Sequence, residues 1–110
     1  MAQPHLASGQ LGSVLPLGAQ LASTPSHALL KAAQLEVMRV VLRAGKAMPE
    51  HRVAGEITVQ CLEGVVDFRA GADVHRLRAG DFLHLAGGVP HELTAREDAS
   101  LLVTICLLPA

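Results

Sequence analysis

Glycine residues divide the later part of the sequence into short apolar segments, and this spacing limits the fold more than any other feature. The chain after Arg43 is interrupted at Gly45, Gly55, Gly64, Gly71, Gly80, Gly87 and Gly88. The segments that they separate have about the usual strand length of 5 to 6 residues, and no long amphipathic helical pattern runs through them. The glycine spacing therefore predicts an all-β domain.

Alternation of apolar and polar residues identifies the individual strands. In the segment ITVQCLE, one face carries Ile57, Val59 and Cys61, as a half-buried strand requires. The segment VVDF and the segment 73–78 are expected to pair as a hairpin, with Gly71 in the turn. The continuous apolar run SLLVTICLL is typical of a strand that is buried on both faces.

The region from Ala28 to Leu42 allows two interpretations. Its good helix formers would favour a helix if propensity alone decided. Met38, Val40 and Leu42, however, alternate with neighbours on the other face before the break at Gly45. We therefore predict two strands, roughly at 28–33 and 35–43.

Composition and charge limit the classes of partner. A chain of 110 residues fits one domain, and with no Trp or Tyr and only two Phe its core must be aliphatic. Nine Lys and Arg oppose ten Asp and Glu, which gives a formal charge of −1, and the charges are interspersed. We expect no nucleic-acid partner, because such a partner requires a clustered basic surface.

Cysteine usage and the N-terminal segment bear on the cellular location. Cys61 and Cys106 lie in apolar runs without CxxC spacing, which is typical of reduced cysteines in a cytoplasmic protein, although a disulfide between them stays open. The first thirty residues contain no Lys or Arg, so LGSVLPLGAQLA lacks the basic region of a signal peptide. The same stretch is too short to span a membrane, and we expect no membrane partner.

The segment from Gly80 to His91 resembles the second conserved motif of the cupin family. Its Gly80-Asp81 turn, Gly88 and His91 match that motif, whereas Ala86 stands where the family usually has Pro. An upstream segment that contains His51 and ends in LEG is similar to the first cupin motif. The two motifs and the hairpin between them extend the resemblance over roughly residues 28–107.

The resemblance implies a double-stranded β-helix, a jelly-roll barrel whose two sheets curl around a central pocket. We expect this cupin barrel to cover residues 28–110. Residues 1–27 would form an N-terminal arm that is partly ordered or that adds an edge strand.

Cupins usually hold a metal through two His and one Glu of the first motif and the His of the second. The resemblance places His51 and His91 at two of these positions, but Val53 and Ile57 stand at the other two. Any divalent transition metal would therefore have an incomplete ligand set, because tight sites of the zinc type offer three or four protein ligands.

Other side chains are candidates for the pocket. Glu56 is one position away from the metal-binding place, and a one-residue offset in a strand turns a side chain to the opposite face unless a bulge near Gly55 shifts the register. Cys61 is either a ligand-binding thiol or a small buried apolar residue. His84 is either a pocket residue or an outward-facing one, since its strand fits both orientations.

Two functions from different classes remain open. In the first, a stand-alone small cupin binds a small molecule for sensing or storage, with Ile57, Val59 and Cys61 as the wall and His51 and His91 at the polar end. In the second, the chain is a metal-dependent cupin enzyme of the dioxygenase or isomerase type, with a divalent ion on the two histidines. Small cupins are commonly dimers, so we also predict a two-fold homodimer.

Overall fold

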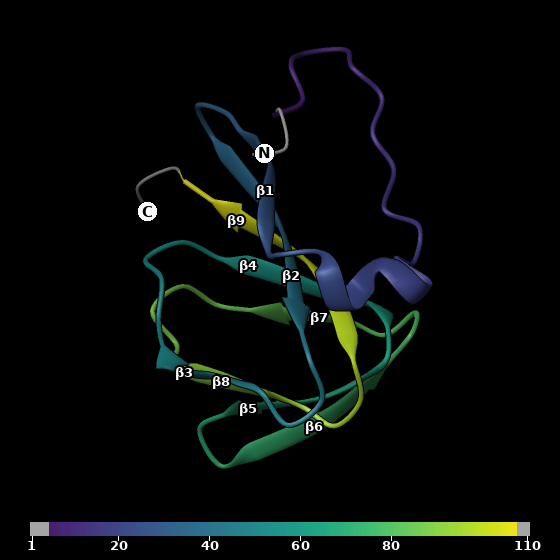
Figure 1. Ribbon diagram of the computed structural model, residues 1–110. Coiled ribbons are helices and arrows are strands. Elements are labelled where there is room, and N and C mark those ends of the chain that lie inside the picture. The colour runs from purple at the N-terminus through teal and green to yellow at the C-terminus, as the bar shows by residue number, and fades with distance from the viewer. Residues whose placement is uncertain (1–4, 108–110) are drawn as a thin grey trace.

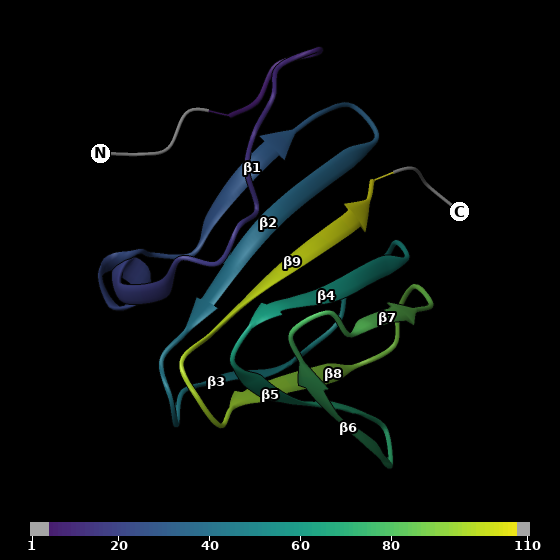
Figure 2. The same cartoon turned by 90° about the vertical axis from the view of Figure 1, so that its right-hand side faces the viewer.

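Two antiparallel β-sheets packed face to face make up most of the protein, as Figures 1 and 2 show from two sides. The structure is a computed structural model that describes residues 5–107. The described strands are β1 (His27–Lys31), β2 (Leu35–Leu42), β3 (Ala47–His51), β4 (Ile57–Glu63), β5 (Val65–Ala70), β6 (Asp73–Arg78), β7 (Phe82–Leu85), β8 (His91–Ala95) and β9 (Ala99–Cys106).

The strand order identifies the architecture. One sheet has the order β1-β2-β9-β4-β7 and the other the order β3-β8-β5-β6, so most neighbours in a sheet are distant in the sequence. Every strand pair is antiparallel. This arrangement is a jelly roll of the double-stranded β-helix type, and it confirms the fold predicted from the sequence.

The ambiguous region near residue 35 forms strands. β1 and β2 occupy His27–Lys31 and Leu35–Leu42, close to the predicted ranges. β2 pairs with β9 along its whole length, from Leu35 opposite Cys106 to Leu42 opposite Ala99. These cross-strand hydrogen bonds outweigh the helix propensity of the segment. The predicted hairpin is also present as β5 and β6, whereas β9 is fully buried only over its first three residues.

The core lies between the inner faces of the two sheets. Most of its buried side chains are aliphatic, as predicted, but Phe68 is its largest fully buried residue. The chain crosses between the sheets at Gly64, which has a φ of 82°. A Cβ atom there would lie 2.1 Å from the carbonyl oxygen of Asp98, so only glycine fits this corner.

An N-terminal arm lies across the outer face of the five-stranded sheet. It contains the 3₁₀ helix η1 (Gly18–Ser23), which Figure 2 shows beside β1 and β2. Leu21 of this helix is buried, and the Leu6 N–H donates to the carbonyl of Leu29 in β1. Residues 1–4 of the predicted arm and 108–110 of the predicted barrel lie outside the described residues.

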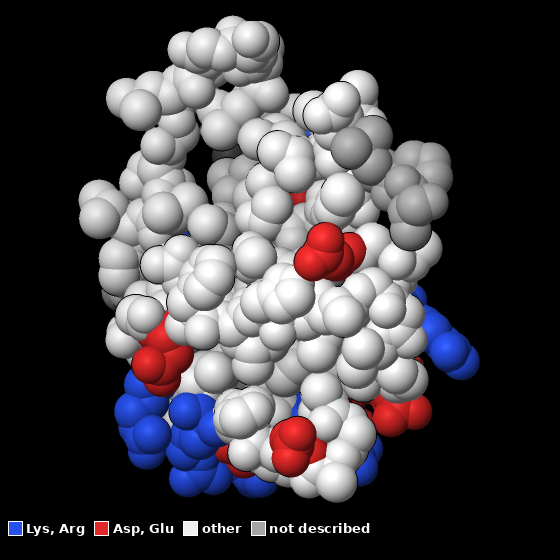
Figure 3. Space-filling view, turned by 180° about the vertical axis from the view of Figure 1, so that it is seen from behind, with Lys and Arg blue, Asp and Glu red and all other residues white. Residues whose placement is uncertain are grey.

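Charged side chains gather at the end of the molecule that is formed by β5 and β6, at the bottom of Figure 3. Several arginines there are paired with acids. Asp67 accepts hydrogen bonds from Arg76 at 2.8 Å and Arg96 at 2.6 Å, and Arg69 lies 2.8 Å from Glu92. Among residues 5–107, no helix is long and apolar enough to cross a membrane.

Candidate functional site

A cavity of about 70 Å³ lies inside the barrel, between the two sheets. Two imidazoles line it, and every other lining side chain is apolar. Strand alternation gives the cavity this character, because alternate residues of each strand face inward. Its walls are Met38, Val40, Met48, His51, Ile57, Val59, Phe68, His91, Leu93 and Val103.

The structure brings the two motif histidines together. His51 in β3 lies directly opposite His91 in β8, and their ring centroids are 4.4 Å apart with an interplanar angle of 57°. The His91 ring also stacks on Phe68 at a centroid distance of 5.5 Å. His91 is only 4% exposed whereas His51 is exposed. We therefore place His51 at the mouth of the cavity and His91 inside it.

Hydrogen bonds determine which ring nitrogens are free. Nδ1 of His51 lies 3.1 Å from the carbonyl oxygen of Pro49, and Nδ1 of His91 lies 2.9 Å from that of Val89. A carbonyl oxygen only accepts, so Nδ1 must carry the hydrogen in both rings. In the neutral rings, Nε2 then holds a lone pair that can accept a hydrogen bond or bind a cation.

Cys61 does not line the cavity. It lies on the same inward face of β4 as Ile57 and Val59, as predicted, and is fully buried, but it stands further along the strand. Its Sγ contacts the carbonyl oxygens of Glu63 and Gly64 at 3.5 and 3.7 Å. Burial raises the pKa of this thiol and favours its neutral form. Cys61 thus packs as a small apolar residue, and both it and Cys106 are free thiols.

His84 also lies away from the cavity. In β7, Leu83 and Leu85 pack against the core, so the side chain between them faces outward. The outward His84 ring places Nε2 2.7 Å from Oε1 of Glu56. Both side chains are more than half exposed. β4 pairs with β7 in regular register from Ile57 onward, so no bulge turns Glu56 into the barrel.

The donor atoms do not fit a complete cupin metal centre. Ile57 is buried and Val53 packs against the core, so aliphatic side chains fill the two remaining family positions. No group of three or more His, Cys, Asp or Glu side chains is arranged to hold a metal ion within residues 5–107. Two imidazoles are fewer than the three or four protein ligands of tight zinc-type sites. A metal on His51 and His91 stays a prediction.

Sequence reasoning missed several walls of the cavity. Phe68 is one of these walls, and its ring stacks against the ring of His91. Alternation in the hairpin places Phe68 on the same face as Val66, and both are completely buried. That pattern was visible in the sequence. The contributions of Met38 and Met48 were not, since they depend on the crossing of the two sheets.

Comparisons with solved structures support the fold. A conserved protein of unknown function from Streptococcus pyogenes has a TM-score of 0.76 at 20% identity, with all of both chains covered. A cupin superfamily protein from Desulfitobacterium hafniense has a TM-score of 0.75 at 15% identity, covering 89% of this chain and 95% of its own. Salicylate 1,2-dioxygenase from Pseudaminobacter salicylatoxidans has a TM-score of 0.63 at 24% identity, covering 66% of this chain but 21% of its own.

Sequence comparison identifies the family. No curated protein matches the chain. The model of the Cupin domain family, however, matches residues 38–107, which is more than half of the sequence and includes both histidine motifs. This chain therefore belongs to the Cupin domain family.

Proposed function

We propose that the barrel cavity binds a small, neutral and largely apolar molecule that carries one hydrogen-bond donor, such as a hydroxyl group. The observation that carries this proposal is the combination of apolar walls with two imidazoles whose Nδ1 atoms are already bonded to backbone carbonyls. Such a pocket recognises its ligand without covalent chemistry, which suits a role in sensing or storage.

The polarity of the cavity favours a neutral donor over an anion. While the rings are neutral, each Nε2 accepts a hydrogen bond and offers no N–H to a carboxylate or phosphate. The apolar walls would also remove the hydration of a charged ligand without replacing it. An alcohol or phenol would direct its hydroxyl toward His51 and His91 and its carbon atoms toward the walls.

The volume of the cavity limits the ligand. A dry apolar cavity of about 150 Å³ holds a benzene molecule, and the barrel cavity has about half that volume. The enclosed part of the ligand is therefore smaller than benzene. Because His51 is exposed, a larger molecule would extend past its ring into solvent.

A metal-dependent cupin enzyme of the dioxygenase or isomerase type is the second candidate function. One observation favours it: histidines that bind metals usually donate their second ring N–H to a carbonyl or carboxylate, and both His51 and His91 do so. The incomplete donor set counts against this candidate, so we rank it second.

Binding of small alcohols and phenols tests the first proposal. The protein would be titrated with these compounds, and the NMR signals of the methyl groups of Val59 and Leu93 should show saturable binding. The variant His91→Phe keeps a ring on Phe68 but removes Nε2, and should weaken binding about three- to tenfold, the value of one hydrogen bond. The matched control His84→Phe changes a ring outside the cavity and should leave binding unchanged. Absence of saturable binding, or equal weakening by both variants, would contradict the proposal.

Elemental analysis separates the two candidates. The protein would be purified without an affinity tag, incubated with iron, manganese, zinc or nickel salts, and freed of unbound metal. Stoichiometric metal that is lost in both His51→Ala and His91→Ala would contradict a metal-free pocket. No retained metal with any of these salts would contradict the enzyme hypothesis.

We also propose that the protein is a two-fold homodimer. The arm exposes Leu11 and Leu15, which are 96% and 74% accessible, and β1 is an edge strand of the larger sheet. Unpaired strand edges and apolar side chains favour association with a second copy. Size-exclusion chromatography with light scattering should give the mass of a dimer, and a monomer at micromolar concentration would refute the proposal.

A further inference from the structure

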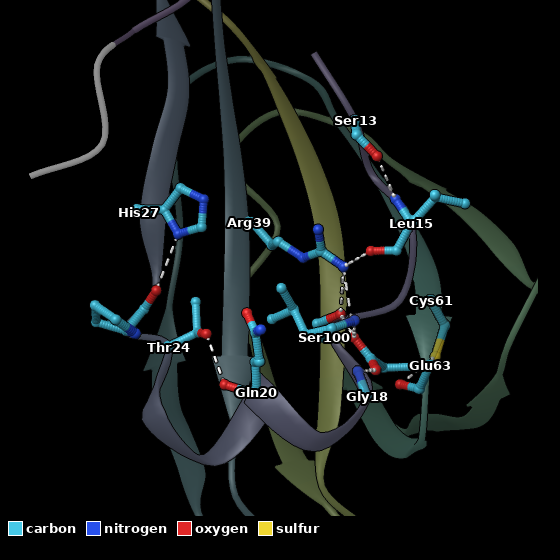
Figure 4. A network of polar contacts seen from close by, with 12 residues as sticks. Ser13, Leu15, Gly18, Gln20, Thr24, His27, Arg39, Cys61, Glu63 and Ser100 are labelled. Atoms are coloured by element: carbon cyan, nitrogen blue, oxygen red, sulfur yellow. Dashed lines mark hydrogen bonds and ion pairs between the residues drawn. The ribbon is translucent and has the colours of Figure 1, made fainter.

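A second cavity lies outside the barrel, between the N-terminal arm and the outer face of the five-stranded sheet. Its volume is about 380 Å³, which falls within the range of about 300 to 1,000 Å³ that is typical of small-molecule pockets. Arg39 and His27 come from the sheet side, and Gln20 and Thr24 from the arm side. Figure 4 shows these four side chains around the space between the arm and the sheet.

Arg39 is the most unusual group in this cavity. Its neighbour Val40 faces the core, so Arg39 faces the arm, where it is only 3% exposed. Nη2 donates to the Leu15 carbonyl at 2.5 Å and to the Ser100 hydroxyl at 3.2 Å. Nε, in contrast, is buried and has no hydrogen-bond partner among the residues that the structure describes.

Glu63 balances the charge of Arg39 but leaves its hydrogen bonding incomplete. Its Oε2 lies 3.5 Å from Nη2 of Arg39, and the same oxygen accepts hydrogen bonds from the Leu17 N–H and the Ser100 hydroxyl. Its Oε1 accepts from the Gly18 N–H at 3.1 Å. One carboxylate thus serves four donors, and Nε of Arg39 is not one of them, so the buried guanidinium keeps an unsatisfied N–H.

The remaining lining residues match an amphipathic acid. No Asp or Glu lines the cavity, and the Glu63 carboxylate beside Arg39 is already satisfied by four donors. Leu6, Leu17 and Leu29 supply apolar surface beside the polar groups. The Ser13 hydroxyl accepts from the Leu15 N–H and keeps its own hydrogen free to donate. A carboxylate with a short aliphatic chain would place its charged group against the polar side chains and its carbon atoms against the leucines.

We propose that this arm cavity binds a small aliphatic carboxylate, which pairs with the guanidinium of Arg39 and whose carbon atoms contact the leucines. Charge-assisted hydrogen bonds from arginine to carboxylate are among the strongest in proteins. The site is independent of the barrel cavity, which favours a neutral ligand. Its occupant would contact both the arm and the sheet, and would hold the two together.

Titration of the whole protein with butanoate tests the site. NMR signals of the Arg39 Nε–H group and the Gly18 amide report the binding. Both signals should shift with a single saturation curve. Butanol, which has the same chain length without the charge, should bind at least tenfold more weakly, as expected for the loss of a charge-assisted hydrogen bond. Equal binding of butanol, or no shift of Nε–H with butanoate, would overturn the proposal.

Two variants localise the binding. Arg39→Lys keeps the positive charge but removes the planar guanidinium, and should weaken butanoate binding about tenfold or more. Ala28→Leu fills the cavity from β1 while it leaves Arg39 in place, and should also abolish the shifts. If Arg39→Lys does not fold, Ala28→Leu decides alone. Unchanged butanoate binding in Ala28→Leu would overturn the proposal, and His91→Phe, which alters only the barrel cavity, is the matched control.

Discussion

The barrel cavity and the arm cavity are built from opposite kinds of interaction. In the barrel, His51 and His91 bond only to carbonyls two residues earlier in the sequence, and all other lining side chains are apolar. Under the arm, a buried network of charged and polar groups joins four segments that are far apart in the sequence, around Leu15, Arg39, Glu63 and Ser100.

This difference teaches which physical force supports each region. The core around the barrel site should respond to changes in packing and remain insensitive to salt, because apolar burial carries no charge. The arm should respond to the loss of single charges, because each buried charge depends on its partners. Substitutions in the two regions test this contrast.

The largest effect is expected in the barrel. Phe68 is completely buried and supports the His91 ring, so Phe68→Ala should lower the free energy of unfolding by about 3 to 5 kcal/mol. Urea denaturation would measure it, with the same loss at low and high salt. Phe82 is 64% exposed, and Phe82→Ala is the matched control with a much smaller loss. A comparable loss in both variants would contradict the proposed importance of packing.

The next effect lies under the arm. Glu63→Ala leaves the Arg39 charge and the Leu17 and Gly18 N–H groups without their acceptor, and should cost about 3 kcal/mol. Hydrogen exchange of the Leu17 and Gly18 amides should accelerate at the same time. Urea denaturation and exchange measured by NMR would check the two results.

Glu56→Ala provides the control for that prediction. Its carboxylate is exposed and pairs only with His84, and exposed ion pairs contribute about 0 to 1 kcal/mol. If removal of Glu63 costs no more than removal of Glu56, the arm is held by other contacts, such as the buried Leu21.

The sequence allowed the barrel site to be predicted better than the arm network. Alternation placed Ile57 inside and Glu56 outside, and motif spacing paired His51 with His91; the structure agrees on each orientation. These predictions needed only the period of a strand. Alternation does not decide the orientation of His84, because Phe82, an apolar residue that is nevertheless exposed, lies on the same face of the strand.

The arm network escaped prediction because its members are distant in the sequence. Arg39 and Glu63 are 24 positions apart, and Arg39 and Ser100 are 61 positions apart. Only the pairing of β2 with β9 and of β9 with β4 brings them together. No local pattern distinguishes a buried Arg39 from the exposed arginines of other strands.

Acid should weaken the arm through Glu63. Burial alone would raise the pKa of Glu63, but the Leu17 N–H, the Ser100 hydroxyl, the Gly18 N–H and Arg39 together outweigh burial and hold the pKa below its ordinary value. The folded state therefore binds fewer protons than the unfolded state at this group. Its stabilising contribution is complete above the ordinary pKa of about 4.3 and is lost as the pH falls through the lower folded value.

Comparison with Glu63→Gln isolates this effect. The difference in unfolding free energy between the two proteins, measured by urea denaturation, should shrink as the pH falls below about 4.3, the ordinary glutamate pKa. Asp67, whose pKa is lowered by Arg76 and Arg96, is present in both proteins, so its own titration cancels. A difference that stays constant with pH would show that Glu63 acts by shape and hydrogen bonding instead of charge.

The smallest effect should come from His84. Its ring and Glu56 form an exposed pair on the outer face of the larger sheet, where solvent screens the charges, so His84→Ala should change the unfolding free energy by less than about 0.5 kcal/mol. Binding in the barrel and under the arm should also stay unchanged, because His84 lines neither cavity. A marked loss of alcohol binding in His84→Ala, measured by the same NMR titration, would mean that the outer face of β7 is coupled to the barrel. The prediction that the two cavities bind their ligands independently of the outer surface would then be wrong.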